Sequence, residues 1–194
     1  MFANRSSPEV VRHVPHRWLI SQWTRMGALP DPTMAAFGFE PASIDLTRSV
    51  ITRVVPIRDA ARFLILHFGS QLAEAVSVDD AQGRHLDEIL APPTRDHILA
   101  QYELCRRGRK PVYSIACTTD AHDVPVDYEK LLLPFINNQG EVVSILATTL
   151  LISTEGRFER DGIFAHGDFP PPSAVVVYSI DVPREDHPHA VASV

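Results

Sequence analysis

Cysteine is scarce in this sequence, since Cys105 and Cys117 are the only two among 194 residues. Two cysteines cannot build a disulfide framework or a four-cysteine metal site, so we expect a reducing, cytoplasmic setting. Positive charge is also in deficit, with 18 Lys and Arg against 24 Asp and Glu and a formal net charge of −6. Nucleic acid is therefore not expected as the main partner.

Long hydrophobic runs are missing as well. The N-terminus, MFANRSSPEVVRHVPHRW, mixes charges with prolines and has no signal-peptide core. The most apolar stretch, residues 142–152, is interrupted by Ser144, Thr148 and Thr149 and is about half as long as a membrane-spanning helix. We expect no secretion and no membrane span. No Gly-rich phosphate loop, GxSxG or HExxH motif occurs, so no catalytic or metal-binding residue is assigned.

Proline is plentiful, and its 16 copies divide the chain into three parts. Residues 1–33 form an N-terminal extension with an amphipathic helix that begins near Pro15 and ends at Gly27, followed by a Pro-containing linker. Residues 34–153 form the core. Residues 154–194 form a Pro-rich tail that we expect to be loosely ordered, except for 174–180 (AVVVYSI), which could add a strand to a sheet edge in this chain or in a partner.

Within the core, two strand patterns precede the helices and three follow them. Residues 49–56 and 62–68 are rich in β-branched and aromatic side chains, and the second run closes on Gly69. Short helical pieces follow, and then a helix from Thr94 to about Arg107. Residues 111–119, 126–136 and 141–153 favour strands, the last two joined by a hairpin turn. This order does not suit a doubly wound parallel sheet and predicts an antiparallel α+β fold.

Several segments in this order resemble a PAS domain, and more narrowly the short stand-alone bacterial PAS proteins. They are the leading helix with Trp18, then Gly27 and LPDPT; the strand RFLILHFGSQL; Gly83 to Leu86 before a short helix; and YEKLLLPFINNQGEVVSILA. The resemblance spans roughly residues 16–152 and has no clear counterpart for 77–82. It implies a five-stranded antiparallel sheet in the order 2-1-5-4-3, with helices on one face, a flanking N-terminal helix and a small internal cavity.

The cavity should be mainly apolar and suit a small apolar ligand or none. The residues expected to line it are Phe63, Ile65, Ile98, Tyr102, Tyr113, Ile115, Leu131 and Leu133. A register error of one residue would exchange the two faces of a strand.

A tightly bound cofactor is not expected. Cys105 lies in YELCRRGRK, which lacks the run that flavin-binding photosensors use, and is interpreted as a buried thiol. His97 could resemble a haem ligand on a helix, but it is turned away from the inward stripe. We therefore expect a colourless protein.

Other polar groups have ordinary interpretations. His67 is expected to be a hydrogen-bonded strand histidine. The loop with Asp120, His122 and Asp123 is interpreted as a solvated turn, and the tail histidines His166, His187 and His189 as poor candidates for a fixed site. The remaining group is one basic cluster. Positive side chains interact favourably with the C-terminal end of a helix, which explains the cluster without a partner. The alternative is a docking surface for an acidic partner or a nucleotide. The cluster consists of Arg106, Arg107, Arg109 and Lys110.

The sequence thus predicts a non-catalytic sensory or protein-interaction module whose output passes through a separate signalling protein. The stripe Leu19, Trp23 and Met26 is expected to form a homodimer contact, with packing on its own sheet as the alternative. Two other functions remain open. One is a small α+β-cone enzyme with Asp120 or Asp127 as base and Tyr113 or Tyr128 as acid, and the other is a haem-loaded sensor.

Overall fold

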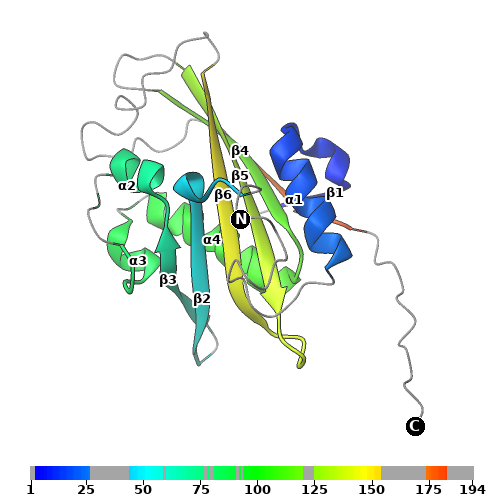
Figure 1. Cartoon of the computed structure of the whole chain (residues 1–194), viewed down its shortest axis with the longest axis vertical. Helices are drawn as coiled ribbons and strands as arrows, with labels where there is room; N and C mark the ends of the chain where they lie inside the picture. The colour runs from blue at the N-terminus through cyan, green and yellow to red at the C-terminus, as the bar shows by residue number, and fades with distance from the viewer. Residues whose placement is uncertain are drawn as a thin grey trace.

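The fold is built on one mixed sheet (Figure 1). The computed structural model describes residues 3–26, 44–58, 60–76, 78, 81–90, 92, 94–119, 125–153 and 174–182. Within these residues the seven-stranded sheet has the order β1-β7-β4-β5-β6-β2-β3. The strands are β1 (Asn4–Ser6), β2 (Ser49–Ile57), β3 (Ala60–Phe68), β4 (Val112–Thr119), β5 (Pro125–Ile136), β6 (Val142–Ser153) and β7 (Ala174–Ile180). The helices are α1 (Val14–Arg25), α2 (Ser70–Val76), α3 (Leu86–Ile89) and α4 (Thr94–Gly108), with short 3-10 turns η1 (Pro8–Val10) and η3 (Leu46–Arg48).

Five of these strands reproduce the predicted sheet. β2 pairs with β3 and β6, and β5 pairs with β4 and β6, all antiparallel. Counted from the β3 edge, these five strands have the order 2-1-5-4-3 along the chain, which confirms the α+β prediction. The residue after β3 must be glycine, because a Cβ at Gly69 would lie 2.3 Å from the carbonyl oxygen of Thr47 in η3.

Two further strands extend the sheet beyond β4. β7 pairs antiparallel with β4, and β1 pairs parallel with β7. The expectation that residues 174–180 add an edge strand is therefore confirmed, in this chain. Asp181, just after β7, accepts hydrogen bonds from Arg5 and Lys110 and so ties the two ends of the described chain to the start of β4. The rest of the predicted tail lies outside the described residues.

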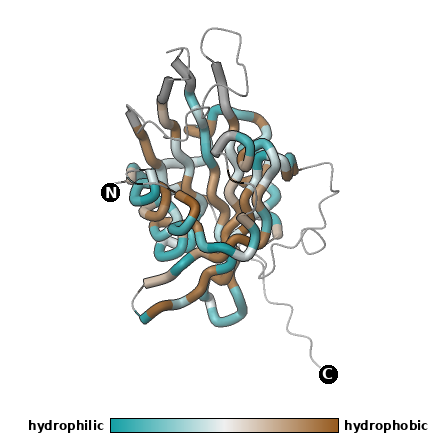
Figure 2. The backbone as a smooth tube through the Cα atoms, turned by 90° about the vertical axis from the view of Figure 1, so that its left-hand side faces the viewer, coloured by the Kyte–Doolittle hydropathy of each residue, from teal (hydrophilic) through white to brown (hydrophobic). Residues whose placement is uncertain are grey.

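The two faces of the sheet carry separate apolar clusters. α3 and α4 cover one face, here called the inner face, where Leu86, Tyr102 and Cys105 pack against Leu132. α1 covers the opposite, outer face (Figure 1). Figure 2 shows that hydrophobic residues follow the central strands between these layers, while the outward sides of the helices are hydrophilic. None of the described helices is long and apolar enough to cross a membrane.

The predicted dimer stripe is buried on the chain's own sheet. Leu19 is 5% exposed and Trp23 is 9% exposed, and Met26 packs beside them. The indole nitrogen of Trp23 donates a hydrogen bond to the Pro134 carbonyl at 2.7 Å. Leu19 and Trp23 are thus covered by the chain's own sheet, which favours the alternative interpretation of the stripe, and the homodimer contact stays a prediction. The prolines of the predicted linker lie outside the described residues.

Candidate functional site

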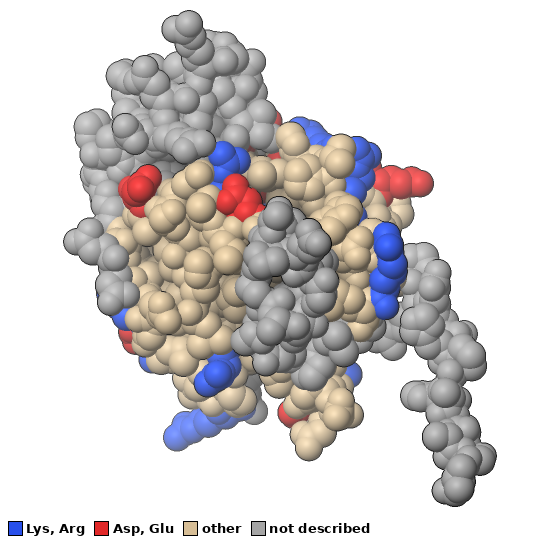
Figure 3. Space-filling view, in the orientation of Figure 1, with Lys and Arg blue, Asp and Glu red and all other residues tan. Residues whose placement is uncertain are grey.

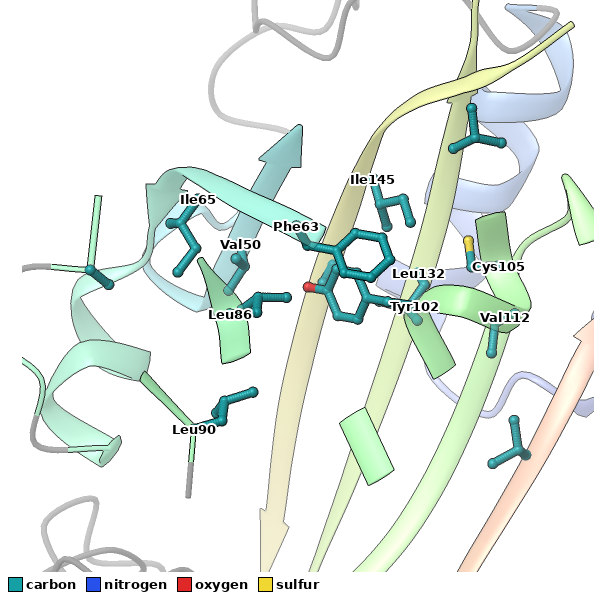
Figure 4. Close-up of a cluster of buried hydrophobic side chains, with 14 residues drawn as sticks. Val50, Phe63, Ile65, Leu86, Leu90, Tyr102, Cys105, Val112, Leu132 and Ile145 are labelled. Atoms are coloured by element: carbon teal, nitrogen blue, oxygen red, sulfur yellow. The ribbon is translucent and has the colours of Figure 1, made fainter. Parts of the chain in front are cut away.

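The candidate site lies on the inner face, where α4 crosses the sheet. α4 begins and ends close to the predicted positions, and its residues Tyr102 and Cys105 point at the strands. The ring of Tyr102 meets the ring of Phe63 from β3, with centroids 5.0 Å apart and an angle of 57° between planes. Figure 4 shows these two rings beside Leu132 and Ile145 of the central strands. The site therefore has a wall of close-packed apolar side chains.

A chain of hydrogen bonds runs along this wall. The Ser114 hydroxyl on β4 donates to the Gln101 side-chain oxygen at 3.1 Å. The Gln101 amide nitrogen lies 2.9 Å from Nε2 of His97, one helical turn earlier. Because an amide nitrogen only donates, His97 Nε2 accepts and the imidazole is neutral with its proton on Nδ1. Burial lowers the pKa of His97, and the nearby charge of Lys130 lowers it further.

Lys130 is the unusual member of the site. It is the cross-strand partner of Ser114 and shares its inward side, yet it is only 8% exposed. Among the described residues its ammonium forms no ion pair, and it is not one of the side-chain atoms that are closed off from solvent without a hydrogen-bond partner. Burial lowers the pKa of Lys130 to about 8. A buried ammonium without a counter-charge destabilises a fold, which makes such a position typical of a binding site.

Lys130→Met is expected to stabilise the protein by about 2 kcal/mol at pH 7, because it replaces a desolvated charge with an apolar side chain of similar length. The unfolded lysine titrates near 10.4, so between pH 8 and that value the unfolded state binds more protons than the folded state. Wild-type stability should therefore rise with pH in this window, and the advantage of the variant should shrink. Urea unfolding at pH 7 and pH 10 measures both effects.

The sequence has only two lysines, so Lys110 supplies the control. Its ammonium pairs with Asp181, and Lys110→Met should not stabilise the protein. NMR of lysine labelled at Cε resolves the two titrations directly. A loss of stability in Lys130→Met would contradict the assignment of Lys130 as an unpaired charge.

The predicted cavity residues divide between the two faces. Phe63, Ile65, Ile98 and Tyr102 belong to the inner cluster, as expected. The other four were assigned to the wrong face, since they pack on the α1 side: Tyr113, Ile115, Leu131 and Leu133. In β5 the inward residues are Lys130 and Leu132, so the expected register was shifted by one residue.

The residues considered as cofactor ligands are buried or hydrogen-bonded within the fold. Cys105 is fully buried, which raises the pKa of its thiol and keeps it protonated, as a structural thiol should be. A haem at His97 would have to displace Gln101 from Nε2. His67 Nε2 donates to the Leu46 carbonyl at 2.9 Å, which confirms a hydrogen-bonded strand histidine. Asp120, His122, Asp123 and the three tail histidines lie outside the described residues.

A second buried polar cluster, missed from the sequence, lies on the outer face under α1. His16 Nε2 is 2.7 Å from the Thr148 hydroxyl, and the Tyr113 hydroxyl donates to the Glu129 carboxylate. His13 Nε2 approaches the same carboxylate at 3.7 Å. The only sequence signal for either cluster is the pair Glu129 and Lys130, two charged residues at the start of the apolar run LLLPFI. Among the described residues no three potential metal ligands lie together.

Comparison with known proteins gives structural likeness only. No family model matches the chain. No curated protein matches it either. A structure of VqmA bound to DPO matches over 46% of this chain and 47% of that one, with 12% identity and a TM-score of 0.38. A Vibrio cholerae VqmA–ligand–DNA complex matches over 58% and 51%, with 11% identity and a TM-score of 0.42. A light-oxygen-voltage domain with a flavin analogue matches over 55% and 78%, with 11% identity and a TM-score of 0.38.

The matched region spans about half the length of the VqmA chains. Likenesses this distant assign no ligand, partner or activity to this chain. Its own strand order, with helices between the second and third strands of the central five, makes the fold PAS-like.

Proposed function

We propose that this chain is a non-catalytic sensory or signalling module that binds a small molecule between α4 and the sheet. The observation that carries the proposal is Lys130, a lysine only 8% exposed that forms no ion pair with a described residue and lies opposite Ser114, which bonds Gln101. A ligand with an oxygen acceptor would supply the missing counterpart. The ligand state would then be passed to a separate protein.

The chemistry of the site favours a ligand with two different ends. Phe63, Tyr102 and Leu132 offer apolar contact. Lys130 and His97 offer a cationic group and a neutral imidazole beside it. A small molecule with an apolar body and a carbonyl or carboxylate end satisfies both, which refines the purely apolar ligand expected from the sequence.

The acid–base enzyme receives no support from the geometry. Asp127 and Tyr128 are neighbours on β5 and point to opposite faces of the sheet. Tyr113 lies on the outer face, where its hydroxyl is bonded to Glu129. Asp127 shares this face, but it lies opposite Cys117, four residues along β4 from Tyr113, which is too far for the two groups to act on one substrate as base and acid. Asp120, the other predicted base, lies outside the described residues. A binding module is therefore the better proposal.

Methyl NMR tests the proposal, because neighbouring leucines of β5 report on opposite faces. A fragment library with short carboxylic acids and their matching alcohols is titrated into the protein. We expect a carboxylic acid to shift the inner-face methyls of Leu132, Ile65 and Ile145 and to leave those of Leu131 and Leu133 unmoved. Lys130→Met should remove the preference for the acid over the alcohol.

Two outcomes would contradict the proposal. One is a library in which no compound moves an inner-face methyl, and the other is shifts confined to the outer face. An absorption spectrum of the purified protein checks the haem and flavin alternatives, and a Soret band lost in His97→Ala would favour the haem sensor.

A further inference from the structure

A cleft lined by arginines lies at one end of the sheet, away from Lys130. It has a volume of about 320 Å³, within the range of small-molecule sites. Three connections build it: the β2–β3 turn, the α4–β4 connection, and the start of β6 after the β5–β6 turn (Figure 1). Its lining consists of Val54, Pro56, Arg58, Ala60, Ala61, Arg106, Arg107, Arg109, Glu141, Val142 and Val143.

Two of the four arginines occupy unusual backbone conformations. Arg58 has a φ of 48° and Arg109 a φ of 53°, in the left-handed region that side chains other than glycine rarely adopt. Within the described residues neither guanidinium has an ion pair. The Arg109 guanidinium lies against the β5–β6 turn, where Gly140, itself at a φ of 79°, would place a Cβ 3.5 Å from Nη1. The connections thus present two cations that have no ion pair among the described residues, at positions under backbone strain.

The other two arginines are held by one carboxylate. Arg106 donates to Glu103 at 2.7 Å, and Arg107 also pairs with Glu103. On the far rim, the Glu141 carboxylate accepts from the Asn137 amide at 3.2 Å. Among the described residues, these four guanidinium groups and the carboxylates of Glu103 and Glu141 leave a local net charge of +2, in a protein whose overall charge is −6. Figure 3 shows basic side chains at the lower end of the molecule, where the β2–β3 turn lies.

We propose that this cleft binds a small phosphomonoester with an apolar body. The dianionic phosphate matches the local charge, and guanidinium groups bind phosphate oxygens through paired hydrogen bonds. Valines, a proline and two alanines form the rest of the lining and suit a ring or short alkyl group. This site is separate from the one under α4, so either can fail without the other.

Phenyl phosphate is the probe, with inorganic phosphate and phenol as its two halves. Isothermal titration at low ionic strength is expected to show phenyl phosphate binding more tightly than inorganic phosphate, and phenol not binding. The variant Arg58→Gln/Arg109→Gln should weaken phenyl phosphate binding about tenfold or more, since it removes both of these guanidinium groups.

A matched control removes the same charge elsewhere. Arg17 and Arg53 are exposed and lie outside the cleft, so Arg17→Gln/Arg53→Gln should bind phenyl phosphate as the wild type does. Glu141→Gln removes a rim carboxylate and should strengthen binding about two- to fivefold. A gain of this kind cannot come from misfolding.

Each contrary result overturns the proposal. An equal loss in the two double variants would mean that only net charge matters. Equal affinity for phenyl phosphate and inorganic phosphate would indicate an adventitious ion only. No binding of phenyl phosphate to the wild type, or no gain in Glu141→Gln, would show that the cleft is not a phosphomonoester site.

Discussion

Trp23→Ala is expected to lower the free energy of unfolding by about 3–5 kcal/mol, in the range of buried aromatic truncations. The indole fills the space between α1 and the outer face beside Leu133 and Phe135. The indole N–H also donates a hydrogen bond to the carbonyl of Pro134. Pro134 lies on β5 beyond the last residue that pairs with β4. Truncation therefore leaves both a cavity and an unpaired carbonyl. Urea unfolding followed by circular dichroism measures the loss.

Trp18→Ala is the matched control, because it makes the same chemical change on the same helix at a partly exposed position. Its loss should be clearly smaller. Light scattering on both variants tests the interface predicted from the sequence. If Trp23→Ala kept its stability and changed only from dimer to monomer, the stripe would belong to an interface between copies, and the packing described here would be wrong.

Lowering the pH from 6.5 to 4 is expected to destabilise the packing of α1 against the sheet through the titration of His16. This imidazole is 1% exposed, its Nε2 bonds the Thr148 hydroxyl, and its Nδ1 has no hydrogen-bond partner among the described residues. Burial, and then the charge of His13, lower the pKa of His16 to about 4. The folded state thus binds the proton less readily than the unfolded state does.

The sign of the effect follows from this difference. Between pH 6.5 and 4 the unfolded state takes up a proton that the folded state refuses, so stability is highest above this window and falls as pH falls. The loss through His16 amounts to about 3 kcal/mol when the whole window has been crossed. Tyr113, Glu129 and His13 face the same space, and Glu129 can offset part of the added charge.

His16→Gln isolates this contribution. The glutamine is not protonated in this range, so the difference in stability between variant and wild type should change by about 3 kcal/mol between pH 7 and pH 4. Other carboxylates titrate in both proteins and cancel in the difference. A difference that stays constant with pH would show that His16 is protonated in the folded state as easily as in the unfolded one.

The two apolar clusters show for which residues the sequence pattern predicts the face of the sheet and for which it does not. Tyr102 was placed on the inward face of α4 correctly, because a helix fixes side-chain directions within four residues. Leu131 and Leu133 were placed on the wrong face, because LLL in β5 has no alternation and each of its residues is fully buried. A strand with both faces covered carries no polar side to set its register.

The sequence by itself determined the order and type of the central five strands and of the main helices, but not the short strand β1. Turn residues such as Gly140, and the helical period from Thr94, act over a few residues and do not need the rest of the chain. Only the tertiary structure decided what covers α1, and which residues meet at the candidate sites. The charge of Lys130 acts on His97, and His16 bonds Thr148, across 33 and 132 positions of sequence. Such contacts depend on strand register and on which face each helix covers, and a shift of one residue exchanges the faces without changing any local pattern.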